Sequence, residues 1–134
     1  MRRTSMIAAA LALASSAALA AGLTPTAKTK IKSEWMTRTG TTREALNNTR
    51  IFPDLTFHNE RKPEDTVPAG SKVVVREIDF PKNEVQIDLQ IAGTKQWTEV
   101  HFVFPALEGD LTAEQREQLQ AMWDKLIAGE TPGE

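Results

Sequence analysis

The stretch Lys72–Phe104, KVVVREIDFPKNEVQIDLQIAGTKQWTEVHFVF, decides the fold of this 134-residue chain. It contains three runs rich in β-branched and aromatic residues, Lys72–Phe80, Val85–Ala92 and Gln96–Phe104, with short turns between them. The middle run alternates apolar and polar residues, which is typical of a strand with one buried and one solvent-facing side. The stretch therefore predicts three consecutive antiparallel strands joined as two hairpins.

The turn Gly93-Thr94 sets the register of the second hairpin. A two-residue turn with glycine first suits a type II′ hairpin and places Ala92 opposite Lys95. The pairs that follow join apolar with apolar and polar with polar residues: Gln90–Trp97, Leu89–Thr98, Asp88–Glu99, Ile87–Val100, Gln86–His101 and Val85–Phe102. A slip by one residue would mix the two faces, so this register is favoured.

The turn Lys82-Asn83 sets the first hairpin in the same way. Its pairs are Phe80–Val85, Asp79–Gln86, Ile78–Ile87 and Glu77–Asp88. Continued without a break, this register would turn Val73 and Val75 to the solvent side, whereas one extra residue at Arg76 returns both valines to the core. The sequence therefore predicts a β-bulge at Val75–Arg76, which bends the strand and favours a curled sheet.

A helix is expected after Pro105. Thr112 and Gln115 have the spacing of a capping box, and Gly129 is expected to end the helix. Five apolar residues recur at i, i+3, i+4, i+7 and i+8: Leu119, Met122, Trp123, Leu126 and Ile127. This stripe is one face of an amphipathic helix, and it would cover the apolar face of the sheet.

Shorter elements are expected before Lys72. Lys28–Thr37 alternates lysines with less polar residues and predicts an edge strand. Thr41–Glu44 has the spacing of a capping box and predicts a short helical turn. Ile51–Phe57 predicts a short strand, and His58–Gly70, with two prolines and a glycine, predicts a surface loop.

Together these elements predict an α+β fold. A curled antiparallel sheet of four or five strands, open or closed into a small SH3-like barrel, would pack on one C-terminal helix. We expect a single domain over residues 28–129, after a loose leader at 21–27 and before a disordered tail at 130–134. The chain has no cysteine, which excludes disulfides and a cysteine-linked lipid anchor.

The first 20 residues have the pattern of a bacterial signal peptide. Arg2 and Arg3 provide a positive start, Met6–Leu19 is weakly apolar, and Ala18-Leu19-Ala20 offers the small residues that a signal peptidase reads. Cleavage is therefore expected before Ala21. Because the apolar run is short and rich in alanine, it does not predict a membrane span. We expect a periplasmic or secreted protein without a transmembrane segment in the mature chain, exported by general secretion or by the twin-arginine route.

Charge and motifs narrow the function classes. Without Arg2 and Arg3 the formal net charge of −2 becomes −4, whereas a nucleic-acid-binding domain is usually basic. The sequence contains no phosphate-binding glycine loop, no Ser-His-Asp or cysteine nucleophile pattern and no zinc-ligand spacing. We therefore expect no nucleic-acid partner and no cofactor other than a weakly bound Ca²⁺ ion.

The two registers place Glu77, Asp88 and Glu99 in one row across three strands, here called the acidic row. Neighbouring strands lie about 4.8 Å apart, and like charges directly opposite one another destabilise a sheet, so the row needs compensation. His101 and Trp97 lie on the same face. These five residues form the candidate binding site.

Three interpretations of the acidic row remain open. The carboxylates could bind Ca²⁺, weakly because a sheet face supplies few carbonyl ligands. Two of them could act as acid and base of a hydrolase, with Trp97 as a platform for a sugar. The row could also be solvated, or neutralised by a basic residue of the N-terminal segment: Lys30, Lys32, Arg38 or Arg43.

The leading hypothesis is a small exported binding module that acts on an envelope component or a partner protein. Its basis is an exported domain without a recognisable nucleophile, metal or cofactor motif. A carboxylate-based hydrolase using Glu77, Asp88 and Glu99 is the alternative. A structural or inhibitor protein of the cell envelope is the third hypothesis.

Overall fold

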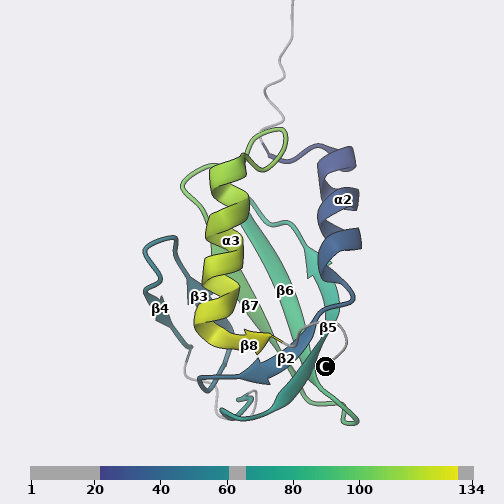
Figure 1. The fold of residues 1–134 in the computed structure, drawn as a ribbon, viewed down its shortest axis with the longest axis vertical. Helices are drawn as coiled ribbons and strands as arrows, with labels where there is room; N and C mark the ends of the chain where they lie inside the picture. The colour runs from purple at the N-terminus through teal and green to yellow at the C-terminus, as the bar shows by residue number, and fades with distance from the viewer. Residues whose placement is uncertain (1–21, 61–65, 130–134) are drawn as a thin grey trace, which may run out of the picture.

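The structure is a computed structural model that describes residues 22–60 and 66–129. Within these residues, seven strands form one curled sheet, and two helices lie on one of its faces (Figure 1). The elements in chain order are α2 (Pro25–Trp35), β2 (Thr39–Thr42), β3 (Thr49–Ile51), β4 (Phe57–His58), β5 (Lys72–Asp79), β6 (Glu84–Ile91), β7 (Trp97–Val103), α3 (Ala113–Leu126) and β8 (Ile127–Gly129). The expected signal peptide (1–20) and tail (130–134) lie outside the described residues.

The central hairpins β5–β6 and β6–β7 confirm the predicted registers. Every predicted pair from Gln90–Trp97 to Val85–Phe102 is present. The predicted turn is wrong by one residue, because the Thr94 amide donates to the Ile91 carbonyl at 3.0 Å and Gly93, at φ 80°, is therefore the second central residue of the turn and not the first. In β5–β6 the register shifts between Val75 and Glu77, so Arg76 is the extra residue of the predicted bulge. Both valines accordingly lie in the core.

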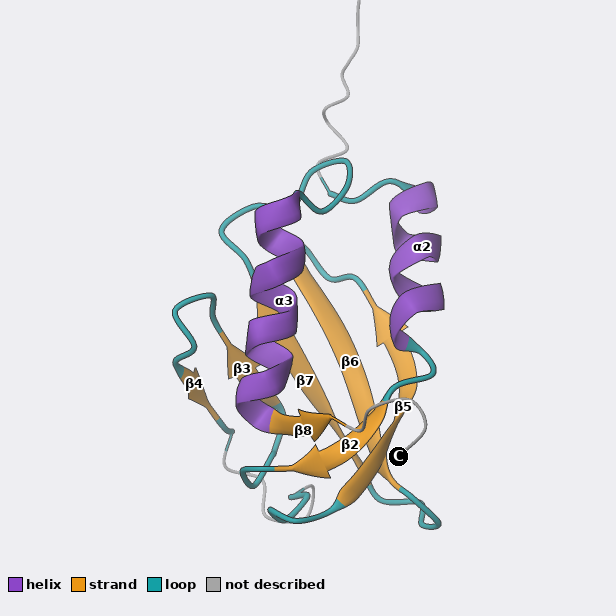
Figure 2. Cartoon of the chain, viewed as in Figure 1, coloured by secondary structure: helices purple, strands orange, loops and turns teal. Residues whose placement is uncertain are grey.

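The sheet is larger than expected and is mixed. Its strand order is β4-β3-β7-β6-β5-β2-β8, and β3 runs parallel to β7, with Thr49 opposite Val100. The α+β class and the curled sheet are confirmed, but the count of four or five antiparallel strands is wrong. The described strands form an open half-barrel with β4 and β8 at its edges, and they do not support an SH3-like barrel (Figure 2).

An edge strand was expected at Lys28–Thr37, but this prediction is wrong, because most of the segment belongs to the helix α2. Thr24 caps α2, because its Oγ1 accepts a hydrogen bond from the Ala27 amide at 3.1 Å, and Pro25 occupies the first turn. Ala27, Ile31 and Trp35 are the buried residues of α2, and their spacing of four is helical. Residues 25–27, expected in a loose leader, therefore belong to this helix.

A strand replaces the expected helical turn at Thr41–Glu44. β2 lies between β5 and β8, so both edges of its backbone find strand partners, which a single capped turn would not provide. Gly40 pairs with Val73 on one side and with Gly129 on the other.

The predicted strand Ile51–Phe57 is split into β3 and β4. Leu55, at φ 72°, lies in the turn between them, and the Asp54 side chain accepts a hydrogen bond from the Thr56 amide at 3.0 Å. His58, expected in a loop, belongs to β4. Within the expected loop His58–Gly70, residues 61–65 lie outside the described residues, and Val67 is fully buried opposite Leu46.

The C-terminal helix confirms its predicted cap and stripe. Thr112 and Gln115 form a reciprocal capping box, and Leu119, Met122, Trp123 and Leu126 are buried. The expected end at Gly129 is wrong, because α3 stops at Leu126 and the next three residues form β8 against β2. Ile127 is still buried, but as a strand residue.

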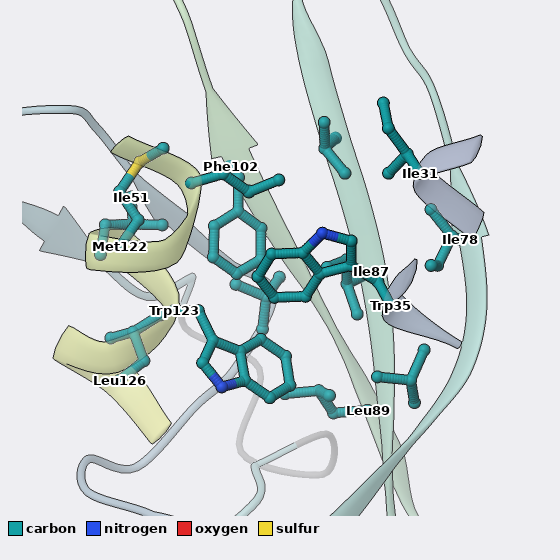
Figure 3. Packing of buried hydrophobic residues seen from close by; sticks show 14 of the residues in the cluster. Ile31, Trp35, Ile51, Ile78, Ile87, Leu89, Phe102, Met122, Trp123 and Leu126 are labelled. Atoms are coloured by element: carbon teal, nitrogen blue, oxygen red, sulfur yellow. The ribbon is translucent and has the colours of Figure 1, made fainter. Parts of the chain in front are cut away.

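The core lies between the two helices and the inner face of the sheet. Trp35 of α2 and Trp123 of α3 meet edge to face, with ring centroids 5.3 Å apart, above Ile87, Leu89 and Phe102 of the sheet (Figure 3). In the described part of the chain, neither helix is long and apolar enough to cross a membrane. The outer face of the central strands carries the polar residues.

Candidate functional site

The predicted acidic row exists on the outer face of the sheet. Glu77 of β5 and Glu99 of β7 lie on either side of Asp88 of β6, each as its direct cross-strand partner. Asp88 is 4% exposed, whereas Glu77 is exposed. The central member of the row is therefore a buried carboxyl flanked by two further carboxyls.

The bulge residue Arg76 supplies the compensating charge. Its Nη1 lies 3.7 Å from Asp88 Oδ2, and its guanidinium carbon lies 4.4 Å from the centre of the Trp97 ring. Arg76 thus reaches from β5 across β6 to an aromatic side chain on β7. The extra residue that bends the strand also provides the cation for the row.

The expected pairing with the basic N-terminal segment is wrong for Arg38 and Arg43. Arg38 donates to Gln120 and Arg43 donates to the Asp124 carbonyl, so both bind α3 on the other side of the sheet. Lys30 and Lys32 lie on α2, which covers the inner face (Figure 1). A helix on the inner face cannot deliver these lysines to the outer face.

The surroundings of Asp88 disfavour its charged form. Burial raises the pKa of Asp88, the hydrogen bond from Gln86 Nε2 at 3.1 Å to Oδ1 opposes this effect, and the charges of Glu99, Asp79 and Glu77 raise the pKa further. The net result is a pKa above the ordinary value of 3.8.

A second cluster of charged residues adjoins the row. His101 Nδ1 lies 2.7 Å from Glu84 Oε1, and His101 Nε2 lies 2.9 Å from Glu99 Oε1. Arg50 Nη1 lies 2.6 Å from the other oxygen of Glu84. Since carboxylate oxygens only accept, both contacts of His101 are hydrogen bonds when both ring nitrogens carry a proton.

Glu84 is held in its charged form by this cluster. Burial by itself raises the pKa of Glu84, but the hydrogen bonds from His101 and Arg50 and their positive charges outweigh that effect. The pKa therefore lies below the ordinary value of 4.5. Asp88 and Glu84, on the same strand, are thus shifted in opposite directions.

The site offers limited means to hold a metal ion. In residues 22–60 and 66–129 no group of three or more His, Cys, Asp or Glu side chains has an arrangement that could hold one. Asp88 Oδ1 accepts from Gln86, and Oδ2 faces Arg76. The other histidine, His58, pairs with Arg50 in the sheet, and its ring lies 6.0 Å from that of Phe52.

All five predicted site residues lie on one face, but three of their partners were not predicted. Arg76 was predicted as the extra residue of a β-bulge but not as the partner of Asp88. Arg50 and Glu84 were not expected at the site, since only the parallel pairing of β3 with β7 brings Arg50 beside His101. The sequence did contain a signal for Glu84. It lies two residues before Gln86 and therefore on the same, polar side of the alternating strand.

Three surface hollows do not include the acidic row, although Glu84 of the adjoining cluster lines one of them. Three hollows in the described part of the chain lie at the β5–β6 turn, on α2, and between α2 and α3. None of these three is lined by Glu77, Asp88 or Glu99. The acidic row lies on the face of the sheet opposite the two helices.

Comparison with known proteins finds no relative. No protein family, no curated protein and no solved structure matches the chain.

Proposed function

We propose that this chain is an exported, non-enzymatic binding module whose acidic row and Trp97 contact a positively charged segment of an envelope partner protein. The observation that carries this proposal is the buried carboxyl of Asp88, flanked by Glu77 and Glu99 on the sheet face opposite the two helices. The helices lie only on the opposite face (Figure 2).

The charge balance of this face favours a cationic partner. The carboxyls of Glu84 and Asp79 adjoin the three of the acidic row, whereas the cations in contact with these carboxyls are Arg50, Arg76 and, when protonated, His101. An approaching Lys or Arg side chain would reduce the repulsion within the row and favour the charged form of Asp88. Such complementarity supports recognition and fast association more than high affinity.

Trp97 supports the same proposal. Trp97 and Met36 are the large hydrophobic residues that are exposed in the described part of the chain, and Trp97 is 36% exposed. Arg76 already lies over this ring. A tryptophan beside fixed charges is typical of the residues that anchor protein interfaces.

Tryptophan fluorescence of the purified protein tests the proposal. Trp35 and Trp123 are buried, so Trp97 should report contacts on the outer face. We expect a hexalysine peptide to change the emission in a saturable way, and less so at high salt because the attraction is screened. A hexaglutamate peptide should have no effect. Absence of any saturable response to hexalysine would contradict the proposal.

Matched charge variants separate this site from general attraction to an acidic protein. Glu77→Gln should weaken hexalysine binding, by about threefold to tenfold if one ion pair is lost. Glu117→Gln removes the same charge from an exposed position on α3 and should leave the affinity unchanged. Equal weakening by both variants would show that hexalysine responds to net charge and not to the acidic row.

Carboxylate-based hydrolysis is the second candidate function. The raised pKa of buried Asp88 is a property of general acids, and Glu99 is its direct neighbour on β7. In this case the protein should release nitrophenol from p-nitrophenyl glycosides, and Asp88→Asn should abolish that release. Activity equal to that of buffer would remove this candidate for such substrates.

A further inference from the structure

A groove between the two helices has the features of a separate ligand site. A hollow of about 440 Å³ lies where α2 and α3 face one another. Its size is in the range of small-molecule pockets. Its lining combines three buried apolar side chains with four polar ones: Trp35, Leu111 and Leu119, and Glu34, Arg38, Arg116 and Gln120.

Arg38 is held rigidly at the rim of this groove. Its guanidinium carbon lies 3.5 Å from the centre of the Trp35 ring, and its Nη1 donates to Gln120 Oε1 at 2.8 Å. Gln120 Nε2 in turn donates to Asp124 Oδ1 at 3.0 Å, which directs the amide oxygen toward Arg38. Stacking and this hydrogen bond fix the cation before any ligand arrives.

Arg38 has no contacting counterion in the described part of the chain. Its hydrogen-bond partner is a neutral amide, and none of the ion pairs among described residues includes it. Burial lowers the pKa of Arg38, and the charges of Asp124 and Glu34 oppose this effect without contacting the guanidinium. A guanidinium has five N–H donors, so Arg38 retains donors for an anion.

Arg116, across the groove, is already neutralised. Its Nη1 lies 3.2 Å from Glu34 Oε1, and its Nη2 lies 3.1 Å from Asp110 Oδ1. Glu34, the carboxylate that also lines the groove, is bound to Arg116, so Arg38 is the cation of the groove that no described carboxylate contacts. One such charge suits a single carboxylate better than a phosphate, which would bring two negative charges.

From these contacts we propose that the groove binds a small monocarboxylate with an apolar or aromatic tail, whose carboxylate pairs with Arg38 and whose tail lies against Leu111 and Leu119. Arg–carboxylate pairing is geometrically specific, and the apolar base adds burial of the tail. This site is independent of the proposed function, because the groove and the acidic row lie on opposite sides of the sheet.

A matched pair of probes tests the proposal on the purified protein. Calorimetric titration with 4-phenylbutyrate should give saturable binding, and 4-phenylbutanol should bind at least about tenfold more weakly because it lacks the charge. Equal affinity for the acid and the alcohol, or no saturable binding of the acid, would overturn the proposal.

Matched arginine variants locate the binding site. Arg38→Met keeps a side chain of similar length without the charge and should weaken 4-phenylbutyrate binding by at least about tenfold. Arg43→Met is the control, since Arg43 donates to the Asp124 carbonyl of the same helix but does not line the groove. Equal weakening by both variants would overturn the assignment to the groove.

A second variant keeps the test decisive if Arg38→Met does not fold. Gln120→Glu places a carboxylate at the hydrogen-bond partner of Arg38, which would neutralise the guanidinium from within the protein. Binding of 4-phenylbutyrate should then fall to the level of the alcohol. Unchanged preference for the acid in a folded Gln120→Glu variant would overturn the proposal.

Discussion

At the scale of single residues, Asp88 is a position where function and stability are expected to conflict. Its folded-state pKa is raised, mainly by burial, so the free energy of unfolding should fall as the pH rises from 3.8 through the folded-state value. Asp88→Asn removes this cost and should stabilise the fold by about 0.5–1 kcal/mol near neutral pH. Denaturant unfolding measures the difference, which should disappear below pH 3.8.

Asp79→Asn is the control for this prediction: Asp79 is exposed on the same face, and its charge acts on Asp88 less than burial does, so its removal should stabilise the fold by less than Asp88→Asn does. Millimolar Ca²⁺ should leave the unfolding curves of wild type and Asp88→Asn unchanged, since Gln86 and Arg76 lie at the two oxygens of Asp88. If Asp88→Asn instead destabilised the fold near neutral pH, the ion pair with Arg76 would stabilise the charged carboxyl by more than burial destabilises it.

Glu84 is expected to respond in the opposite direction. Because its folded-state pKa is lowered, its contribution to stability is present above the ordinary value of 4.5 and is lost as the pH falls through the folded-state value. Glu84→Gln weakens the hydrogen bonds with His101 and Arg50 and should cost about 1–2 kcal/mol near neutral pH. Urea unfolding across the acid range should show the two proteins converging. If Glu84→Gln lowered the free energy of unfolding by the same amount at every pH, the charge of Glu84 would not be the cause.

At the scale of elements, the pairing of β2 with β8 depends on Gly40. A Cβ atom at this position would lie 2.8 Å from the Ala128 carbonyl oxygen and would also collide with the Ile127 side chain. Gly40→Ala should therefore push β8 away from β2 and cost about 1–3 kcal/mol in the free energy of unfolding. Thr41→Ala, on the same strand but half-exposed, should cost less. Equal costs at the two positions would show that β8 adapts easily.

The packing of α3 can be tested along its stripe. Trp123→Ala and Leu126→Ala each remove a fully or almost fully buried side chain and should cost about 2–5 kcal/mol. Glu117→Ala, on the exposed side of the helix, should cost less than about 0.5 kcal/mol. Chemical denaturation of the three variants measures these differences, and similar values for all three would contradict the observed docking of α3.

The hairpins could be predicted from sequence because their pairing is local. Gly93 sets one register, and the alternation around Arg76 reveals the bulge without knowledge of distant residues. The helix α2 was missed because lysines at every second position imitate a strand, whereas its strongest signals were Thr24 and Pro25 at the start. β2 and β8 pair across most of the chain, and no local pattern determines such a contact.

The candidate site likewise has a part that local sequence predicts and a part that depends on distant contacts. The row Glu77–Asp88–Glu99 follows from two local registers, so the sequence alone predicts it. Arg50 reaches the site through a parallel pairing of β3 with β7, whose residues are about fifty positions apart. The reach of Arg76 to Trp97 depends on a side-chain conformation, which alternation along a strand does not specify.

At the scale of the whole molecule, the fold separates two surfaces. Both helices pack on the inner face, and the groove between them contains Arg38, which no carboxylate of the described residues contacts. The outer face has an excess of carboxylates around Asp88 and an exposed tryptophan. The two proposed sites therefore differ in charge and in shape, which suits a small anion in the groove and a cationic protein segment on the sheet.

The start of the described fold is relevant to export. Leu23 is 8% exposed and pairs with Gly109, and the Thr24 amide donates to the Gly109 carbonyl at 2.9 Å, so residues close after the expected cleavage site take part in the packed domain. Cleavage before Ala21 would leave these contacts intact. We therefore expect mass spectrometry of the exported protein to show a chain that begins at Ala21.

Variants at the expected cleavage site complete this test. Signal peptidase requires small residues at its recognition positions, so replacing Ala18 and Ala20 by leucine should block cleavage and leave the precursor uncleaved at the membrane. Replacing Ala10 by leucine, inside the apolar run, should not affect the cut and serves as the control. Recovery of an intact Met1 terminus in exported wild-type protein would contradict the signal peptide. A terminus inside α2 would also contradict it, since cleavage there would remove the Thr24 cap that begins this helix.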